Sequence, residues 1–122
     1  MSNLKEIAAD FCGFVLHKLD ITPPSKIRLV RERMKDFETY AYYNSKDDSV
    51  NIYVKNRGTA DVLRSIAHEL IHHKQKLKGE LKNEKEIPDV GGPIEDEANA
   101  VAGQLIKTYG KMESKKKFNI YS

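Results

Sequence analysis

The spacing of hydrophobic residues changes twice along this 122-residue chain, and these changes limit the folds it can adopt. Between positions 4 and 19 hydrophobic residues recur every three or four positions, as in a helix that buries one face. Between positions 27 and 54 the spacing falls to two, which is typical of strands. From position 61 the helical spacing returns. We therefore expect one α+β domain, in which a helix, a small sheet and two further helices share a core.

The expected elements divide a single domain, residues 1–122, into five parts. These are an N-terminal helix at 1–20, a sheet at 26–55, helices at 60–78 and 94–110, and a basic tail at 111–122. The sheet is expected to have three or four strands and to be mostly antiparallel, with a hairpin between 39–43 and 50–54. Gly79 and Gly110 are expected to end the two later helices.

Composition and charge exclude several classes of protein. Lys and Arg number 21 against 18 Asp and Glu, and the two signs are interleaved over most of the chain, so nucleic acid is not an indicated partner. No stretch has the roughly 18 apolar residues of a membrane span. The N-terminus lacks the long apolar run of a signal peptide, which favours a soluble cytoplasmic protein. Cys12 is the single cysteine and is expected to be buried as a small apolar residue.

The motif His68-Glu69-Leu70-Ile71-His72 lies within the helix expected at 60–78. At 100° per residue the two histidines are about 40° apart, so one turn brings both imidazoles within reach of one metal ion. Zinc accepts imidazole and carboxylate ligands and leaves a position for water. Glu69 is the expected base that takes a proton from this water. The histidines lie roughly opposite the positions that we expect to face the core, which are Val62, Leu63, Ile66, Ala67, Leu70 and Leu77.

A third metal ligand is expected from the helix at 94–110, where Glu95 and Glu97 are both available. On a helical wheel Glu95 lies about 60° from the centre of the apolar face, and Glu97 lies about 100° away on the other side. Glu95 is therefore favoured, with Glu97 as the alternative. Asn99, one turn after Glu95, could hydrogen-bond a ligating histidine. Either glutamate could also be an ordinary acid in a first helical turn, where the helix dipole favours negative charge.

These two motifs together resemble those of zincins, and in particular of gluzincins, in which a later helix supplies a glutamate ligand. The Glu-Asp-Glu-Ala-Asn segment from Glu95 to Asn99 is also similar to the second motif of ImmA/IrrE-type peptidases. The short chain and the sheet before the first motif are similar to minigluzincins and to small phage-encoded metallopeptidases. The resemblance covers about Tyr40 to Tyr109. One departure is Asn99, which stands where thermolysin-like enzymes have aspartate.

The resemblance implies a zincin-like fold and a narrow-specificity zinc endopeptidase with one Zn²⁺ per chain, held by His68, His72 and Glu95. Glu69 would pass the water proton to the leaving amine. The partner would be a protein or peptide bound as an extended strand along the edge strand, either Tyr40–Tyr43 or Val50–Val54. A monomer is the simplest expectation. An oxyanion donor is expected too, and the sequence does not choose among Tyr53, Tyr109 and His73.

Two other functions and one regulatory device are consistent with the sequence. A zincin fold could bind or regulate a partner without cleaving it. A nucleic-acid-binding module would depend on the lysines of Lys111–Lys117 and on Arg28, Arg31 and Arg33. The residues Phe118–Tyr121 alternate like a short strand, and an inhibitory strand in the cleft is a hypothesis for this tail.

Overall fold

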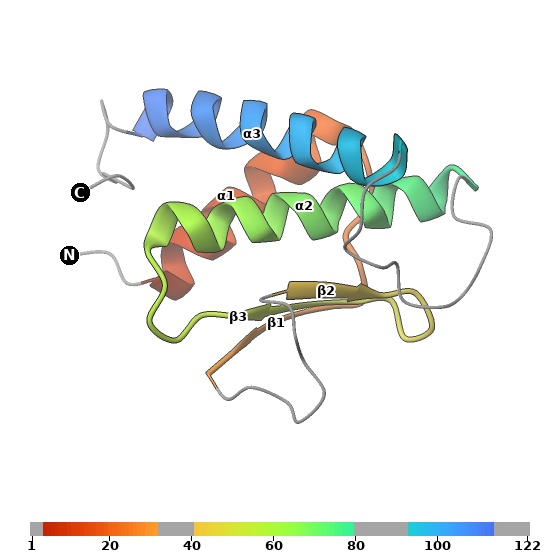
Figure 1. Ribbon diagram of the computed structural model, residues 1–122, viewed down its shortest axis with the longest axis horizontal. Helices are drawn as coiled ribbons and strands as arrows, with labels where there is room; N and C mark the ends of the chain where they lie inside the picture. Colours follow the sequence, from red (N-terminus) through yellow and green to blue (C-terminus); the bar gives the residue numbers. More distant parts are fainter. Residues whose placement is uncertain (1–3, 32–40, 80–92, 114–122) are drawn as a thin grey trace.

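The described part of the protein folds into three helices and a three-stranded sheet, which confirms the α+β expectation. The computed structural model describes residues 4–31, 41–79 and 93–113. Within them α2 lies across one face of the sheet, α3 packs along α2, and α1 contacts both of these helices (Figure 1). The elements are α1 (Leu4–Leu19), β1 (Lys26–Val30), β2 (Ala41–Asn44), β3 (Ser49–Tyr53), α2 (Thr59–Leu77) and α3 (Pro93–Glu113).

The sheet has the order β1-β3-β2, with β3 in the centre. β2 and β3 form the expected antiparallel hairpin, in which Tyr43 is opposite Val50. β1 pairs with β3 in parallel, with Ile27 beside Val50. The sheet is therefore mixed rather than mostly antiparallel. Alternation along a strand shows which side chains share a face, but it carries no information about the neighbouring strand or its direction.

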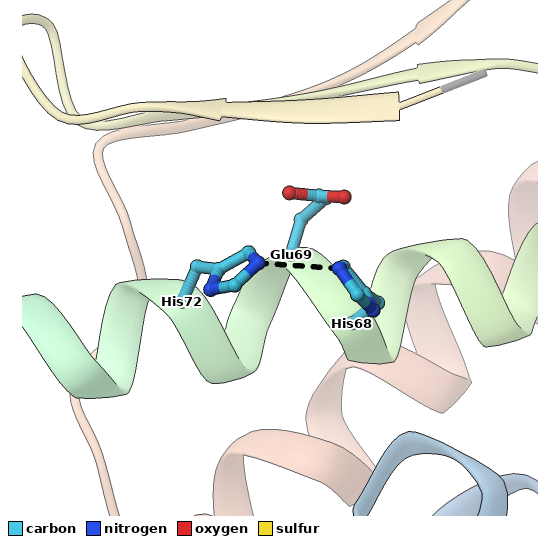
Figure 2. A group of neighbouring side chains, drawn as sticks. All are labelled: His68, Glu69 and His72. Carbon is cyan, nitrogen blue, oxygen red and sulfur yellow. Dashed lines mark hydrogen bonds between the residues drawn. The ribbon is translucent and has the colours of Figure 1, made fainter. Parts of the chain in front are cut away.

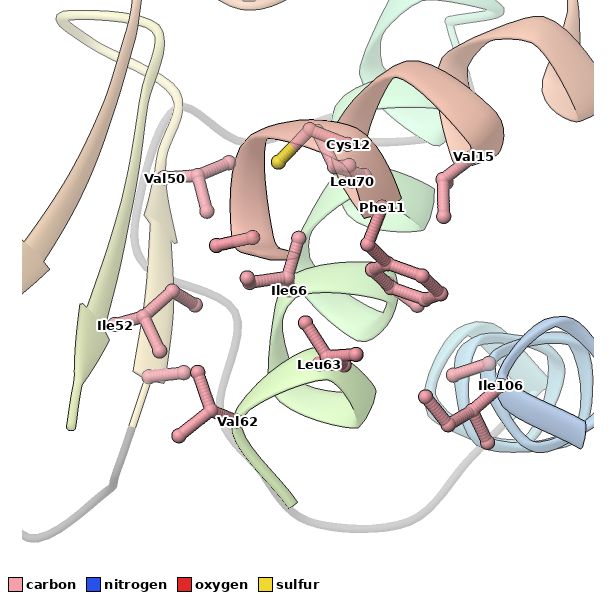
Figure 3. Packing of buried hydrophobic residues seen from close by; sticks show 14 of the residues in the cluster. Phe11, Cys12, Val15, Val50, Ile52, Val62, Leu63, Ile66, Leu70 and Ile106 are labelled. Atoms are coloured by element: carbon pink, nitrogen blue, oxygen red, sulfur yellow. The ribbon is translucent and has the colours of Figure 1, made fainter. Parts of the chain in front are cut away.

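The core lies where α1, α2 and α3 meet each other and the inner face of the sheet (Figure 3). Val50 and Ile52 of β3 are fully buried, as are Phe11 and Val15 of α1. The ring of Phe11 packs edge-on against Tyr109 of α3, with 4.9 Å between the ring centroids. Burial of the apolar faces of three helices is the main source of stability in a domain of this kind.

Three expectations about individual residues have clear outcomes. Cys12 is buried as expected, and burial raises the pKa of its thiol to about 11. Gly79 follows α2 with a φ of 75°, a left-handed conformation that ends helices and suits glycine. Gly110 does not end α3, which continues to Glu113, because a glycine that keeps helical angles weakens a helix without breaking it.

Leu77 is less buried than we expected. We expected it to face the core, but the residue is 51% exposed. It occupies the last turn of α2, beyond the part of the helix whose apolar residues are buried.

The polar loop at 80–92 and the short strand expected at 118–121 lie outside the described residues. Within the described residues no helix is both long and apolar enough to cross a membrane.

The carboxylate of Asp48 ties the β2–β3 hairpin to the rest of the fold. It accepts hydrogen bonds from the Ser25 backbone N–H at 2.9 Å and from the Tyr43 hydroxyl at 2.7 Å, and the Nδ1 atom of His73 on α2 lies 3.0 Å away. Burial acts to raise the pKa of Asp48, but the hydrogen bonds from Tyr43 and Ser25 outweigh it and lower the pKa below its ordinary value of 3.8.

Replacing Asp48 with asparagine should destabilise the protein by about 1–3 kcal/mol at pH 7, because buried hydrogen-bond partners lose a charged acceptor. Asparagine tolerates the left-handed φ of 55° at this position, so backbone strain does not contribute. Since the folded-state pKa is lowered, the stabilisation is present above the ordinary pKa and is lost as the pH falls through the folded-state pKa. Urea unfolding at several pH values should show a difference that shrinks in acid. Asp96→Asn, at an exposed site on α3, is the control, and equal stabilities at pH 7 for wild type and Asp48→Asn would contradict this prediction.

Candidate metal centre

His68 and His72 face one another on successive turns of α2 (Figure 2). Their Nε2 atoms are 3.1 Å apart, and the two rings meet edge to face. The helix positions them in this way because a spacing of four residues returns to nearly the same side of an α-helix. The side chain of His72 is 3% exposed and that of His68 is 12% exposed, so the pair is largely shielded from solvent.

Two carboxylates lie near this histidine pair, and they differ in orientation. The ligand atoms of His68, Glu69 and His72 lie within 4.8 Å of one another, so this group could hold a metal ion. The carboxylate of Glu69, however, turns toward the sheet, away from the facing imidazole nitrogens (Figure 2). The carboxylate of Glu95, on the first turn of α3, reaches both histidines: Oε1 is 2.7 Å from His72 Nε2 and Oε2 is 3.1 Å from His68 Nε2. Geometry therefore favours Glu95 over Glu69 as the third candidate ligand.

The atoms of this cluster fit a first-row divalent metal. Two imidazole nitrogens and one carboxylate oxygen are a common donor set for such ions. With bonds of about 2.0–2.1 Å, ligand atoms of a tetrahedral site lie about 3.3 Å apart, a few tenths of an ångström beyond the separations found here. An ionised carboxylate can only accept hydrogen bonds, so its short contacts with the two Nε2 atoms need either a proton on the nitrogen or a metal ion between the atoms. Glu95 is buried, at 5% exposed, so leaving its carboxylate without such a partner would be costly.

Glu97 and Asn99 do not occupy the positions expected of them. The Oε1 atom of Glu97 accepts a hydrogen bond from Gln75 Nε2 at 2.9 Å, and Oε1 of Gln75 lies 2.7 Å from Nδ1 of His72. Glu97 is thus linked to His72 through the side chain of Gln75. Asn99, which could have hydrogen-bonded a ligating histidine, lies exposed on α3, and the described partner of His72 Nδ1 is Gln75 instead. The spacing of three residues between His72 and Gln75 was a signal for this contact, since such positions are neighbours on a helix.

The three candidates for an oxyanion donor point elsewhere. The hydroxyl of Tyr109 donates to Asp10 at 2.6 Å on α1, and Tyr109 lies about 21 Å along α3 from Glu95. His73 is buried and lies 2.9 Å from the Thr22 carbonyl oxygen, on the side of the hairpin. Tyr53 follows the inward-facing Ile52, so its side chain projects from the other face of the sheet.

The two strands that could serve as the binding edge are now distinguished. β3 has a hydrogen-bonded neighbour on each side, so Val50–Val54 cannot pair with a further strand. β2 is an outer strand of the described sheet, and α2 packs against both β2 and β3. Because Glu69 turns toward this sheet, the general-base candidate lies on the side of the histidine pair that faces the hairpin.

Comparison of the chain with protein-family models, curated proteins and solved structures finds no match in any of the three.

Proposed function

We propose that this protein is a zinc-dependent endopeptidase that hydrolyses a peptide bond by attack of water. The observation that supports it most is that two buried carboxylates near the histidine pair, those of Glu95 and Glu69, are oriented differently. Glu95 contacts both histidine Nε2 atoms and would complete a three-residue ligand set. Glu69 lies beside the cluster with its carboxylate turned toward the sheet, and it would accept the proton of the water. Catalytic zinc sites commonly have three protein ligands and an open position for water, and in zinc hydrolases with this kind of motif a separate glutamate acts as the base.

The residues of the chain have distinct roles in this proposal. His68, His72 and Glu95 would hold the metal ion, which when bound supplies the Lewis acidity that polarises a carbonyl and acidifies water. Glu69 accepts the proton of the attacking water and delivers it to the leaving amine. Glu69 is 5% exposed, so its carboxylate is largely shielded from bulk solvent.

The substrate is a protein or peptide that lies in an extended conformation along β2. Its backbone would pair with β2, an outer strand of the described sheet, through main-chain hydrogen bonds that any sequence can make. Side chains on alternate positions would then determine specificity. The described domain is small, with no second lobe among the described residues, which supports cleavage of exposed segments in particular proteins over general digestion.

Zinc removal and restoration test this function. We expect the zinc-loaded protein to cleave members of a diverse peptide pool, as followed by mass spectrometry. Treatment with 1,10-phenanthroline and removal of the chelator should abolish the cleavage, and about one equivalent of zinc per chain should restore it, because the site has one set of ligands. Cleavage that persists at the same rate in metal-free protein, or a zinc-loaded protein that cuts no peptide in the pool, would contradict the proposal.

A further inference from the structure

Gln75 and Glu97 form a hydrogen-bonded chain behind His72, on the side away from Glu95. Gln75 is 1% exposed and comes from the same helix as His72, three residues later. Both ends of its side-chain amide make short contacts. Oε1 lies 2.7 Å from His72 Nδ1, and Nε2 lies 2.9 Å from Glu97 Oε1. A glutamine held at both ends in this way has one orientation of its amide that satisfies both contacts.

The carboxylate of Glu97 determines that orientation. An ionised carboxylate only accepts hydrogen bonds, so the NH₂ group of Gln75 must face Glu97. The carbonyl oxygen of Gln75 then faces His72, and since it also only accepts, Nδ1 of His72 must carry a proton. In a neutral imidazole this leaves the lone pair on Nε2. That atom is the one that lies 3.1 Å from His68 Nε2 and 2.7 Å from Glu95.

We infer that Glu97 and Gln75 act as positioning residues that hold His72 in the Nδ1-protonated tautomer, so that Nε2 presents its lone pair to a metal ion. This inference rests on the proposed function, because it assigns a role in metal binding. It also explains why an exposed glutamate on α3 contacts a buried amide on α2. Groups that orient a ligating histidine in this way raise metal affinity by typically 10–100-fold.

Zinc affinity of the full-length protein, measured by competition with a chromophoric chelator, tests the inference. Gln75→Leu should weaken zinc binding about 10–100-fold. Glu97→Gln should weaken it less, because the new amide can still pair with Gln75 but no longer forces one orientation. The double variant, which carries both Gln75→Glu and Glu97→Gln, should regain most of the zinc affinity lost in Gln75→Leu. In this double variant a carboxylate at position 75 accepts a hydrogen bond directly from Nδ1 of His72. A residue that only fills space would not produce this recovery.

Two control variants distinguish a specific loss of zinc affinity from a general loss of folded structure. Gln104→Leu makes the same substitution at an exposed site on α3, and Asp96→Asn removes a negative charge next to Glu97; both are expected to bind zinc as the wild type does. Unfolding temperatures of the metal-free variants show whether each one folds.

A second readout does not require bound metal. The ¹⁵N chemical shift of His72 Nδ1 in metal-free protein should show that this nitrogen carries a proton in the wild type and carries it in only part of the molecules in Gln75→Leu. An unchanged zinc affinity together with unchanged protonation of Nδ1 in Gln75→Leu would overturn the inference, even if the wild type binds zinc through Glu95. A wild type that binds no zinc would instead overturn the proposed function, and the chemical shifts would still test the effect of Gln75 on His72.

Discussion

Replacing Glu69 with glutamine is expected to lower the rate of peptide cleavage by about 10²–10⁴-fold, the contribution typical of a general base. Glutamine has nearly the same shape but accepts no proton at neutral pH, so the water loses the group that activates it. The zinc content should stay near one per chain, because the carboxylate of Glu69 turns away from the facing imidazole nitrogens (Figure 2). Rates would be measured on the peptide that the wild type cleaves best, together with zinc content by elemental analysis.

Asp96→Asn is the matched control, since it removes one carboxylate charge at an exposed position of α3. It should cleave at the wild-type rate. A Glu69→Gln protein that cleaves as fast as the wild type would contradict the role of Glu69. A biological effect that survives in Glu69→Gln, with zinc retained and cleavage lost, would favour the alternative that this chain binds or regulates a partner without cutting it.

Replacing Phe11 with alanine is expected to cost about 3–5 kcal/mol of the free energy of unfolding, which is the usual effect of deleting a fully buried aromatic ring. Phe11 is 0% exposed and packs against both Phe14 and Tyr109, so its removal leaves a cavity between α1 and α3. A loss of this size is a large part of the roughly 5–15 kcal/mol that holds a domain together. The midpoint of thermal unfolding should fall by about 10–20 °C.

Leu77→Ala is the control for this substitution, because Leu77 is half exposed at the end of α2 and its removal should change stability by less than about 0.5 kcal/mol. Neither substitution removes a candidate metal ligand, and the Phe11 ring packs against Tyr109 of α3. Phe11→Ala protein that unfolds at the wild-type temperature would show that the three helices do not share the core described above.

The elements of the fold that depend on local periodicity could be predicted from the sequence. The helix at the N-terminus and the helix with the histidine motif have long apolar stripes, and the hairpin has two β-rich segments around a polar turn. The direction of β1 could not be predicted, because its pairing with β3 joins segments far apart in the chain. Gly110 and Leu77 show a second limit: whether a helix end continues or is buried depends on neighbours that the local sequence does not specify.

Part of the candidate site also followed from spacing. His68 and His72 had to share a face of α2, and the helical wheel favoured Glu95, which the structure brings against both of them. The roles of Asn99 and Gln75 were not predictable in the same way. A wheel gives the direction of Asn99 from the axis of α3, but it does not give the angle at which α3 crosses α2. That crossing brings Glu97 to Gln75 and leaves Asn99 exposed.

The central claim is that His68, His72 and Glu95 hold one zinc ion, and a comparison of two isosteric variants tests it most directly. Zinc content would be measured by elemental analysis on wild type, Glu95→Gln and Glu97→Gln, all prepared without a purification tag and dialysed against the same zinc buffer. We expect about one zinc per chain in the wild type and a large loss in Glu95→Gln. Glu97→Gln should keep a content near that of the wild type, because excess zinc in the buffer would saturate a site that is only moderately weakened. A wild type without zinc, or a Glu95→Gln protein that keeps its full content, would contradict the account.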